Sequence, residues 1–209
     1  MAPASTLVVL FMLADGSGGA GPLLEKGERL FRQGDTAGAI AAFDEAAKVD
    51  PKDARAPYLK GVALEKKGDA AAAASAYKQS IARKADFAEP HNNLGALLIA
   101  RGDQQGALDE LEAAVRAKPS YAEAQYNLGV ARDALGKKQE AVAAYKEAVR
   151  LKPTDAAYRL NLGAALRRTG DVDGAVAALR EATRPRRFQA SANSGLSLVA
   201  LSRATEASS

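Results

Sequence analysis

Small and apolar residues recur along this chain at a constant spacing of 34 residues. Two glycine columns follow this spacing, Gly27, Gly61, Gly95, Gly129 and Gly163, and Gly34, Gly68, Gly102, Gly136 and Gly170. An alanine column comprises Ala39, Ala73, Ala107, Ala141 and Ala175, and a column of large residues comprises Phe43, Tyr77, Leu111, Tyr145 and Leu179. Because all columns keep one register without an insertion, the chain is predicted to hold five copies of one structural unit.

The pattern within each unit predicts two helices joined by a short turn. In the fourth unit these helices are AEAQYNLGVARDALG and QEAVAAYKEAVRLKP. Gly136 follows the first helix, where glycine adopts the left-handed conformation that ends a helix. In four units an aspartate suited to cap the next helix comes directly after this glycine, whereas Lys137 breaks the pattern.

Gly129 lies inside its predicted helix, where glycine costs about 1 kcal/mol relative to alanine. Its recurrence in every unit predicts a crowded position at which the second helix, through Ala141 and Ala148, approaches the first. A leucine at Gly129 is therefore predicted to overpack the unit by about 1–3 kcal/mol or more.

These residues resemble the signature of the tetratricopeptide repeat family. The match is carried in the fourth unit by Leu128, Gly129, Ala141, Tyr145, Ala148 and Pro153. The resemblance implies an all-α fold, an α-solenoid in which five stacked helix-turn-helix units coil into a right-handed superhelix. The units are expected at residues 20–53, 54–87, 88–121, 122–155 and 156–189.

Residues 1–19 and 190–209 fall outside the predicted repeats. The apolar run LVVLFMLA at 7–14 is followed by a glycine-rich stretch, which is typical of a signal peptide, but no Lys or Arg precedes it. A segment packed on the first repeat and a start at Met12 are the alternatives, so an exported protein of the periplasm or cell envelope and a cytoplasmic one are equally open. Residues 190–209 are predicted to form a short capping helix, with Leu196, Val199 and Leu201 on one face, and then a frayed tail.

The composition excludes several kinds of chemistry. The chain has no cysteine and a single histidine, His91, so thiolate sites and histidine clusters cannot form. No run approaches the ~20 apolar residues of a transmembrane helix. Neither a phosphate-binding glycine loop nor a catalytic triad is recognisable, so we predict no enzymatic activity, no cofactor and no metal. The abundance of alanine and arginine is typical of a bacterial protein.

The resemblance implies that the first helix of each unit lines a concave groove that binds a peptide or a partner protein. The groove residues carried over are Tyr58, Val62, Asn92, Asn93, Ala96, Tyr126, Asn127, Val130, Leu160, Asn161 and Arg167. Among them Asn93, Asn127 and Asn161 are 34 residues apart and resemble the asparagine ladder of the O-GlcNAc transferase family. An amide carries both a donor and an acceptor, so it matches a peptide backbone. The alternative is that these amides form hydrogen bonds between repeats.

The function predicted from these features is a non-enzymatic interaction scaffold. Self-association through the atypical terminal repeats is one alternative. The other is RNA association through the basic C-terminal end, which includes Arg184, Arg186 and Arg187. The formal net charge of +4 is too small to predict nucleic-acid binding by itself.

Overall fold

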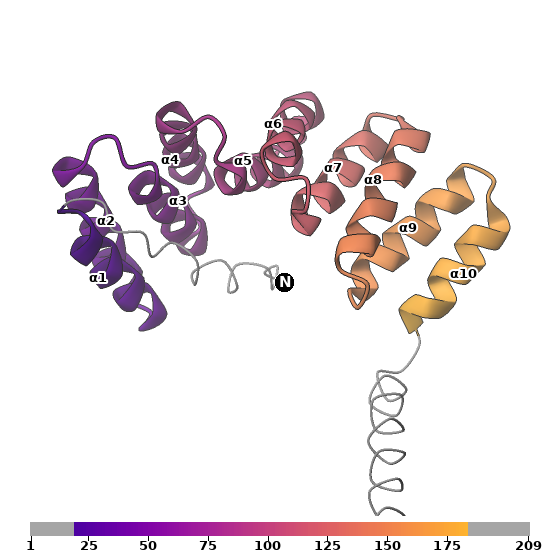
Figure 1. Cartoon of the computed structure of the whole chain (residues 1–209), viewed down its shortest axis with the longest axis horizontal. Coiled ribbons are helices and arrows are strands. Elements are labelled where there is room, and N and C mark those ends of the chain that lie inside the picture. The colour runs from indigo at the N-terminus through magenta and orange to yellow at the C-terminus, as the bar shows by residue number, and fades with distance from the viewer. Residues whose placement is uncertain (1–18, 184–209) are drawn as a thin grey trace, which may run out of the picture. The chain divides into compact units, whose positions relative to one another are not determined.

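The structure is a computed structural model that describes residues 19–183. This part of the chain holds ten α-helices and no strand, which confirms the all-α fold (Figure 1). The helices form successive pairs: α1 (Gly21–Arg32) and α2 (Thr36–Val49), α3 (Arg55–Lys67) and α4 (Ala70–Arg83), α5 (Ala88–Ala100) and α6 (Gln104–Ala117), α7 (Ala122–Ala134) and α8 (Lys138–Leu151), and α9 (Ala156–Arg168) and α10 (Val172–Thr183).

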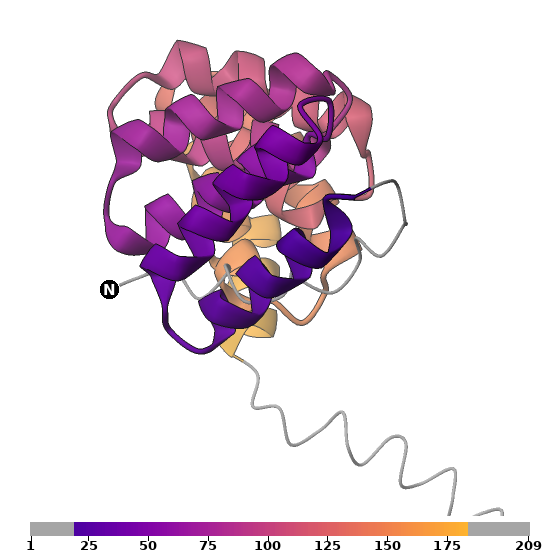
Figure 2. The same ribbon diagram turned by 90° about the vertical axis from the view of Figure 1, so that its left-hand side faces the viewer.

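The helices fall into two compact units, one ending at Pro153 and one beginning at Thr154. In the first unit each pair also packs on the next one, since α2 contacts α3, α4 contacts α5 and α6 contacts α7. Figure 2 shows α1 and α2 in front, with α3 and α4 behind them. This succession of stacked helix pairs is an α-solenoid. In the second unit α9 packs against α10.

The glycines inside the first helices are sites of close packing, as the sequence predicts. A Cβ atom added to Gly129 would lie 2.6 Å from Cε1 of Tyr145, and one added to Gly95 would lie 2.6 Å from Cγ of Leu111. Real Cβ atoms do not approach other atoms so closely, and Tyr145 is itself only 2% exposed. The glycine column therefore makes room for the large residue of the second helix in the same pair.

The helix ends also follow the sequence. The five glycines between paired helices have φ between 74° and 89°, the left-handed conformation expected for them. The aspartates that follow cap the second helices: the carboxylates of Asp35, Asp69 and Asp103 accept backbone N–H groups three residues further on at 2.8–3.0 Å. Lys137 makes no such bond, so α8 begins without a side-chain cap.

Replacing Lys137 with aspartate is expected to stabilise the protein by about 1 kcal/mol, because the new carboxylate would accept the free N–H of Glu140. For a chain of this size that corresponds to a rise in Tm of about 2–4 °C, measured by thermal unfolding. Lys138→Asp is the control, since it adds the same charge at the first helical position without reaching this N–H. Equal shifts in both variants would show that charge rather than capping is responsible.

Parts of the sequence predictions lie outside the described residues. These are the apolar run at 7–14, the capping segment at 190–209 and the arginines at 184, 186 and 187. Within residues 19–183, none of the helices combines the length and apolar character needed to cross a membrane.

Candidate functional site

The predicted groove residues differ in exposure. In the first unit Tyr58 and Val62 on α3 and Asn92 on α5 are buried. The remaining five are half-buried, and we call them the α5–α7 face: Asn93, Ala96, Tyr126, Asn127 and Val130. The buried residues are not accessible to a partner, so its direct contacts would fall on the five half-buried side chains.

The second unit carries the remaining predicted residues on α9. Leu160 is 46% exposed, which is unusual for a large apolar side chain, and Arg167 is also exposed. Asn161 is half-buried and donates a hydrogen bond from Nδ2 to the carbonyl of Ala157 in its own helix at 3.0 Å.

A continuous chain of hydrogen bonds runs through the first unit from α7 to α3. Asn127 Nδ2 donates to Asn92 Oδ1 at 2.9 Å, and Asn92 Nδ2 donates to Asn93 Oδ1 at 3.2 Å. Asn93 Nδ2 donates to the hydroxyl of Tyr77 at 3.2 Å, and this hydroxyl donates to Glu65 Oε2 at 2.7 Å. The network therefore connects three successive helix pairs.

The carboxylate of Glu65 fixes the direction of this network. An ionised carboxylate only accepts hydrogen bonds, so the Tyr77 hydroxyl must donate to it. Burial, and then the negative charge of Glu65, raise the pKa of Tyr77 far above its ordinary value, so the phenol keeps its proton. With that proton committed, Tyr77 accepts from Asn93, and each amide behind it is oriented in turn. Asn127 is left with an Oδ1 atom that has no partner among the described residues.

The asparagine column is thus not uniform. Asn93 bonds to a tyrosine of the preceding pair, Asn127 bonds to the asparagine at 92 on α5, and Asn161 bonds to its own backbone. Spacing alone predicted three equivalent amides, because it does not show what each amide meets on the neighbouring helix. The sequence analysis did not place Tyr77 in the network. A signal was present, because Tyr77 carries a hydroxyl in a column that also contains Phe43 and Leu111.

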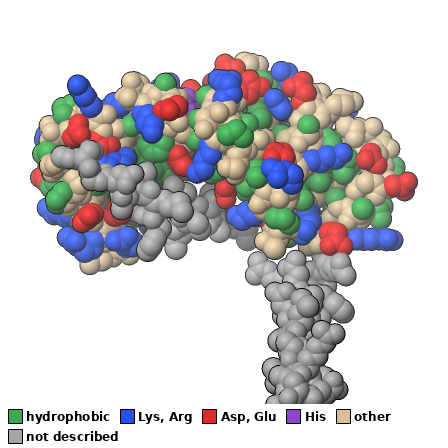
Figure 3. All heavy atoms as spheres, viewed as in Figure 1, with side chains coloured by type: hydrophobic (Ala, Val, Ile, Leu, Met, Phe, Trp, Pro, Cys, Tyr) green, Lys and Arg blue, Asp and Glu red, His purple; other side chains and the backbone are tan. Residues whose placement is uncertain are grey.

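Acidic side chains in the first turns of α5 and α7 form ion pairs with lysines. Glu89 meets Lys118 at 3.0 Å, and Glu123 meets Lys152 at 3.2 Å, one repeat further on. Figure 3 shows Lys and Arg side chains interspersed with Asp and Glu over the visible face of the helices. Since these pairs are partly exposed, each is expected to add only about 0–1 kcal/mol.

The only histidine is buried between α5 and α6 and is 6% exposed. Its Nδ1 lies 2.6 Å from Glu110 Oε2, and its Nε2 lies 3.0 Å from the carbonyl oxygen of Ala85. Burial by itself would lower the pKa of His91, but the hydrogen bonds to Glu110 and Ala85 and the charge of Glu110 outweigh it and raise the pKa above its ordinary value. With an acceptor at each nitrogen, His91 in its protonated form can donate to Glu110 on α6 and to the loop before α5 at the same time.

Metal binding is not indicated in the part of the chain that the structure describes, where no group of three or more His, Asp or Glu side chains is placed to hold an ion. The site is therefore a set of oriented amides, apolar side chains and one tyrosine ring. Tyr126 packs against Tyr145 with ring centroids 5.8 Å apart. Such a surface offers hydrogen bonds and apolar contacts rather than reactive groups.

Comparison with known proteins gives consistent results. A family model for the tetratricopeptide repeat matches residues 24–89, 92–156 and 132–191. Among solved structures, MamA from Desulfovibrio magneticus RS-1 is 27% identical with a TM-score of 0.71, and the alignment covers 81% of this chain and 96% of that one. A search of curated proteins found no match.

Two further structures share the fold at lower identity. YrrB, a tetratricopeptide repeat protein with an unusual peptide-binding site, is 21% identical with a TM-score of 0.66, over 78% of this chain and 84% of its own. PilF of Pseudomonas aeruginosa is 19% identical with a TM-score of 0.69, over 80% and 78%. At these identities the likeness shows the fold alone.

Proposed function

This chain belongs to the tetratricopeptide repeat family, and from that premise we propose that it is a non-enzymatic scaffold that binds an extended segment of a partner protein on the α5–α7 face. Proteins of this family are in general interaction scaffolds that bind proteins or peptides. The finer proposal concerns which residues make the contact and what they recognise.

The observation that carries the proposal is the oriented pair of amides at Asn93 and Asn127. Both are half-buried and held in one direction by the network that ends at Glu65. Asn127 Oδ1 is open to accept a hydrogen bond, whereas the Asn93 amide is held by hydrogen bonds to the side chains of Tyr77 and Tyr58. An extended peptide backbone presents N–H groups that match the acceptor of Asn127. Because the amides are already fixed, little conformational freedom would be lost on binding.

Ala96 and Val130 supply the apolar part of the same face. Each lies on the helix that carries one of the amides, at the next position along it that is not buried. A backbone gripped by amides would place alternate side chains against them, which favours small or apolar residues in the partner. This is a binding surface of low sequence specificity.

The proposal is tested by selecting binding peptides from a random phage-displayed library and measuring their affinity by fluorescence polarisation. The double variant Asn93→Ala and Asn127→Ala is expected to weaken the selected peptides about tenfold, corresponding to the loss of one hydrogen bond of about 1.4 kcal/mol to the Asn127 acceptor, which Asn93 helps to orient. Gln105→Ala with Gln139→Ala is the matched control, since it removes two exposed amides at the starts of α6 and α8. Circular dichroism would verify that both variants are folded. Equal affinity in both double variants would refute binding at this face.

Self-association is a second candidate because α10 exposes an apolar stripe. Val172, Val176 and Leu179 are all exposed, whereas Phe43, Tyr77 and Leu111, which correspond to Leu179 in the first three pairs, are buried. Light scattering at several concentrations tests this alternative. Association through RNA rests on arginines outside the described residues and stays a prediction, tested by a steep loss of binding with salt.

A further inference from the structure

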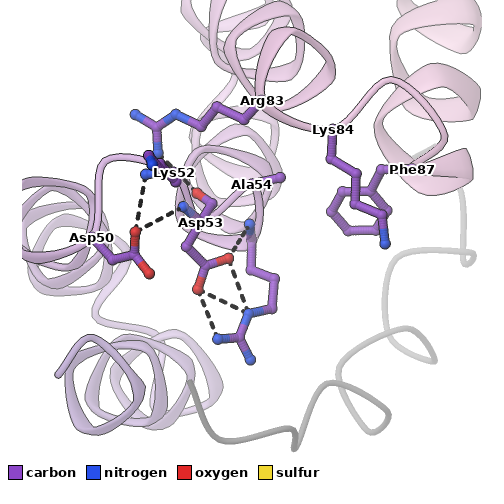
Figure 4. A pocket seen from close by; sticks show the side chains of 8 residues that line it. Asp50, Lys52, Asp53, Ala54, Arg83, Lys84 and Phe87 are labelled. Atoms are coloured by element: carbon purple, nitrogen blue, oxygen red, sulfur yellow. Dashed lines mark hydrogen bonds and ion pairs between the residues drawn. The ribbon is translucent and has the colours of Figure 1, made fainter. Parts of the chain in front are cut away.

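A pocket of about 420 Å³ opens in the first unit where the α2–α3 loop meets the end of α4 (Figure 4). Its lining comprises Asp50, Lys52, Asp53, Ala54, Arg55, Arg83, Lys84 and Phe87. Four of these side chains are cationic and two are carboxylates, so positive charge is in surplus. None of these residues belongs to the α5–α7 face.

The floor of the pocket is held in place from α4. Ser80 Oγ donates to the carbonyl of Ala54 at 2.8 Å, and Arg83 Nη1 donates to the carbonyl of Asp53 at 2.9 Å. Asp50 Oδ1 accepts the backbone N–H groups of Lys52 and Asp53 at 3.0 and 3.2 Å. The loop is therefore fixed before any ligand arrives, which lowers the entropy cost of binding.

Both carboxylates of the pocket already accept hydrogen bonds from other groups of the protein. Asp53 accepts from Nε and Nη2 of Arg55 at 3.0 and 2.7 Å, and its side chain is only 7% exposed. Burial would raise the pKa of Asp53, but the hydrogen bonds and charge of Arg55 outweigh it and hold the pKa below its usual value. Asp50 bonds to the two loop N–H groups. Asp53 also feels the charge of Arg83, but neither carboxylate forms an ion pair with Lys52 or Lys84.

Three cations of the pocket form no salt bridge among the described residues. Lys52 and Lys84 are exposed and form no ion pair, and Arg83 bonds only to the backbone of the loop. Lys84 Nζ lies 5.8 Å from the centroid of the Phe87 ring. Figure 4 shows Lys52 and Arg83 on one side of Ala54, and Lys84 with Phe87 on the other.

The corresponding junction one repeat later lacks this arrangement. There Asp86 and Ala117 replace Lys52 and Arg83. Lys118 replaces Lys84 and also lies over an aromatic ring, that of Tyr121, but it is paired with Glu89. The set of unpaired cations is therefore a property of this one junction and not of the repeat pattern.

We propose that this pocket binds an extended acidic segment of a partner protein, with carboxylate side chains meeting Lys52 and Arg83 on one side of Ala54 and Lys84 on the other. The separation of the cations across Ala54 favours a chain with several acidic groups over a single small anion. Phe87 gives the segment an apolar wall, and its ring packs on Tyr58 of α3 with centroids 5.1 Å apart. This site is independent of the α5–α7 face, so either proposal can fail alone.

The test measures binding of a fluorescein-labelled octapeptide of four Glu-Ala repeats to the full chain by fluorescence polarisation at low salt. The double variant Lys52→Gln and Lys84→Gln is expected to bind about tenfold more weakly, because two exposed charge contacts are lost. Lys118→Gln with Lys152→Gln is the matched control: it removes the same charge from the equivalent rim of the later repeats, where each lysine already has a carboxylate partner. This control is expected to bind as the unmodified chain does.

Three results would overturn the proposal. The first is an absence of binding by the unmodified chain, and the second is an equal loss in both double variants, which would show that only net charge matters. The third is displacement of the peptide by inorganic phosphate at the peptide's own concentration, which would indicate a site for a lone anion. A matching octapeptide of Gln-Ala repeats should bind the unmodified chain and the Lys52→Gln and Lys84→Gln variant with equal affinity, and the Asn93→Ala and Asn127→Ala variant should still bind the acidic octapeptide more tightly than the Gln-Ala octapeptide.

Discussion

Replacing Gly129 with leucine is expected to destabilise the protein by about 3 kcal/mol. A helix propensity scale alone predicts the opposite sign, since a non-glycine residue should gain about 1 kcal/mol in a helix interior. Packing decides the outcome, because even a Cβ at this position would lie 2.6 Å from the ring of Tyr145. Tyr145 is buried and cannot swing away into solvent, so α7 and α8 would have to separate.

The effect is measured as the change in the free energy of unfolding in urea. Ala143→Leu on the exposed side of α8 is the control, because it adds a leucine side chain to the same helix pair without a steric conflict. It should change the free energy by no more than about 0.5 kcal/mol. A Gly129 variant as stable as this control would show that α7 and α8 do not pack closely at Gly129.

Replacing His91 with glutamine is expected to cost about 2 kcal/mol at pH 5.5 and clearly less at pH 8.5. The pKa of His91 is raised in the folded protein, so its contribution is complete below its unfolded pKa of about 6.5 and is lost as pH rises through the folded value. The size follows from a hydrogen bond between charged groups, here the imidazolium and Glu110. Once neutral, the ring can donate to only one of its two acceptors.

Glutamine suits this test because the chain already uses it at the equivalent position. Gln125 is buried like His91 and donates from Nε2 to the carbonyl of Pro119 at 3.4 Å, as His91 Nε2 faces the carbonyl of Ala85. The variant should therefore fold and keep one of the two hydrogen bonds. Urea unfolding of both proteins at the two pH values gives the comparison. A difference in stability that does not change with pH would show that protonated His91 does not contribute.

The repeat register allowed the fold to be predicted in detail. Glycines and aspartates report local backbone requirements, a left-handed φ in one case and a helix cap in the other, so their positions alone fixed the helix ends. The crowded glycine column was predictable for the same reason, since a costly residue kept in five helices must fill a steric role. Even the missing cap at Lys137 was visible in the sequence.

The candidate site was only partly predictable. The half-buried amides of Asn93 and Asn127 were identified, but their partners depend on side chains of other helix pairs that no spacing rule relates to them. The cationic pocket was not foreseen because it joins Lys52 in a loop to Arg83 and Lys84 about 30 positions later, where the repeat columns carry no signal. A repeat pattern does not predict sites that are built from residues outside its columns.

All hydrogen bonds in the chain from Asn127 to Glu65 point the same way, and the carboxylate of Glu65 sets that direction. If glutamine replaced Glu65, its amide could donate to Tyr77, the phenol could turn its proton toward Asn93, and all three asparagine amides could rotate by half a turn. Asn127 would then offer an N–H where it now offers an oxygen. A substitution on α3 would in this way turn the hydrogen-bond acceptor at Asn127, two helix pairs away, into a donor. The amides would change their orientation while the backbone stayed in place.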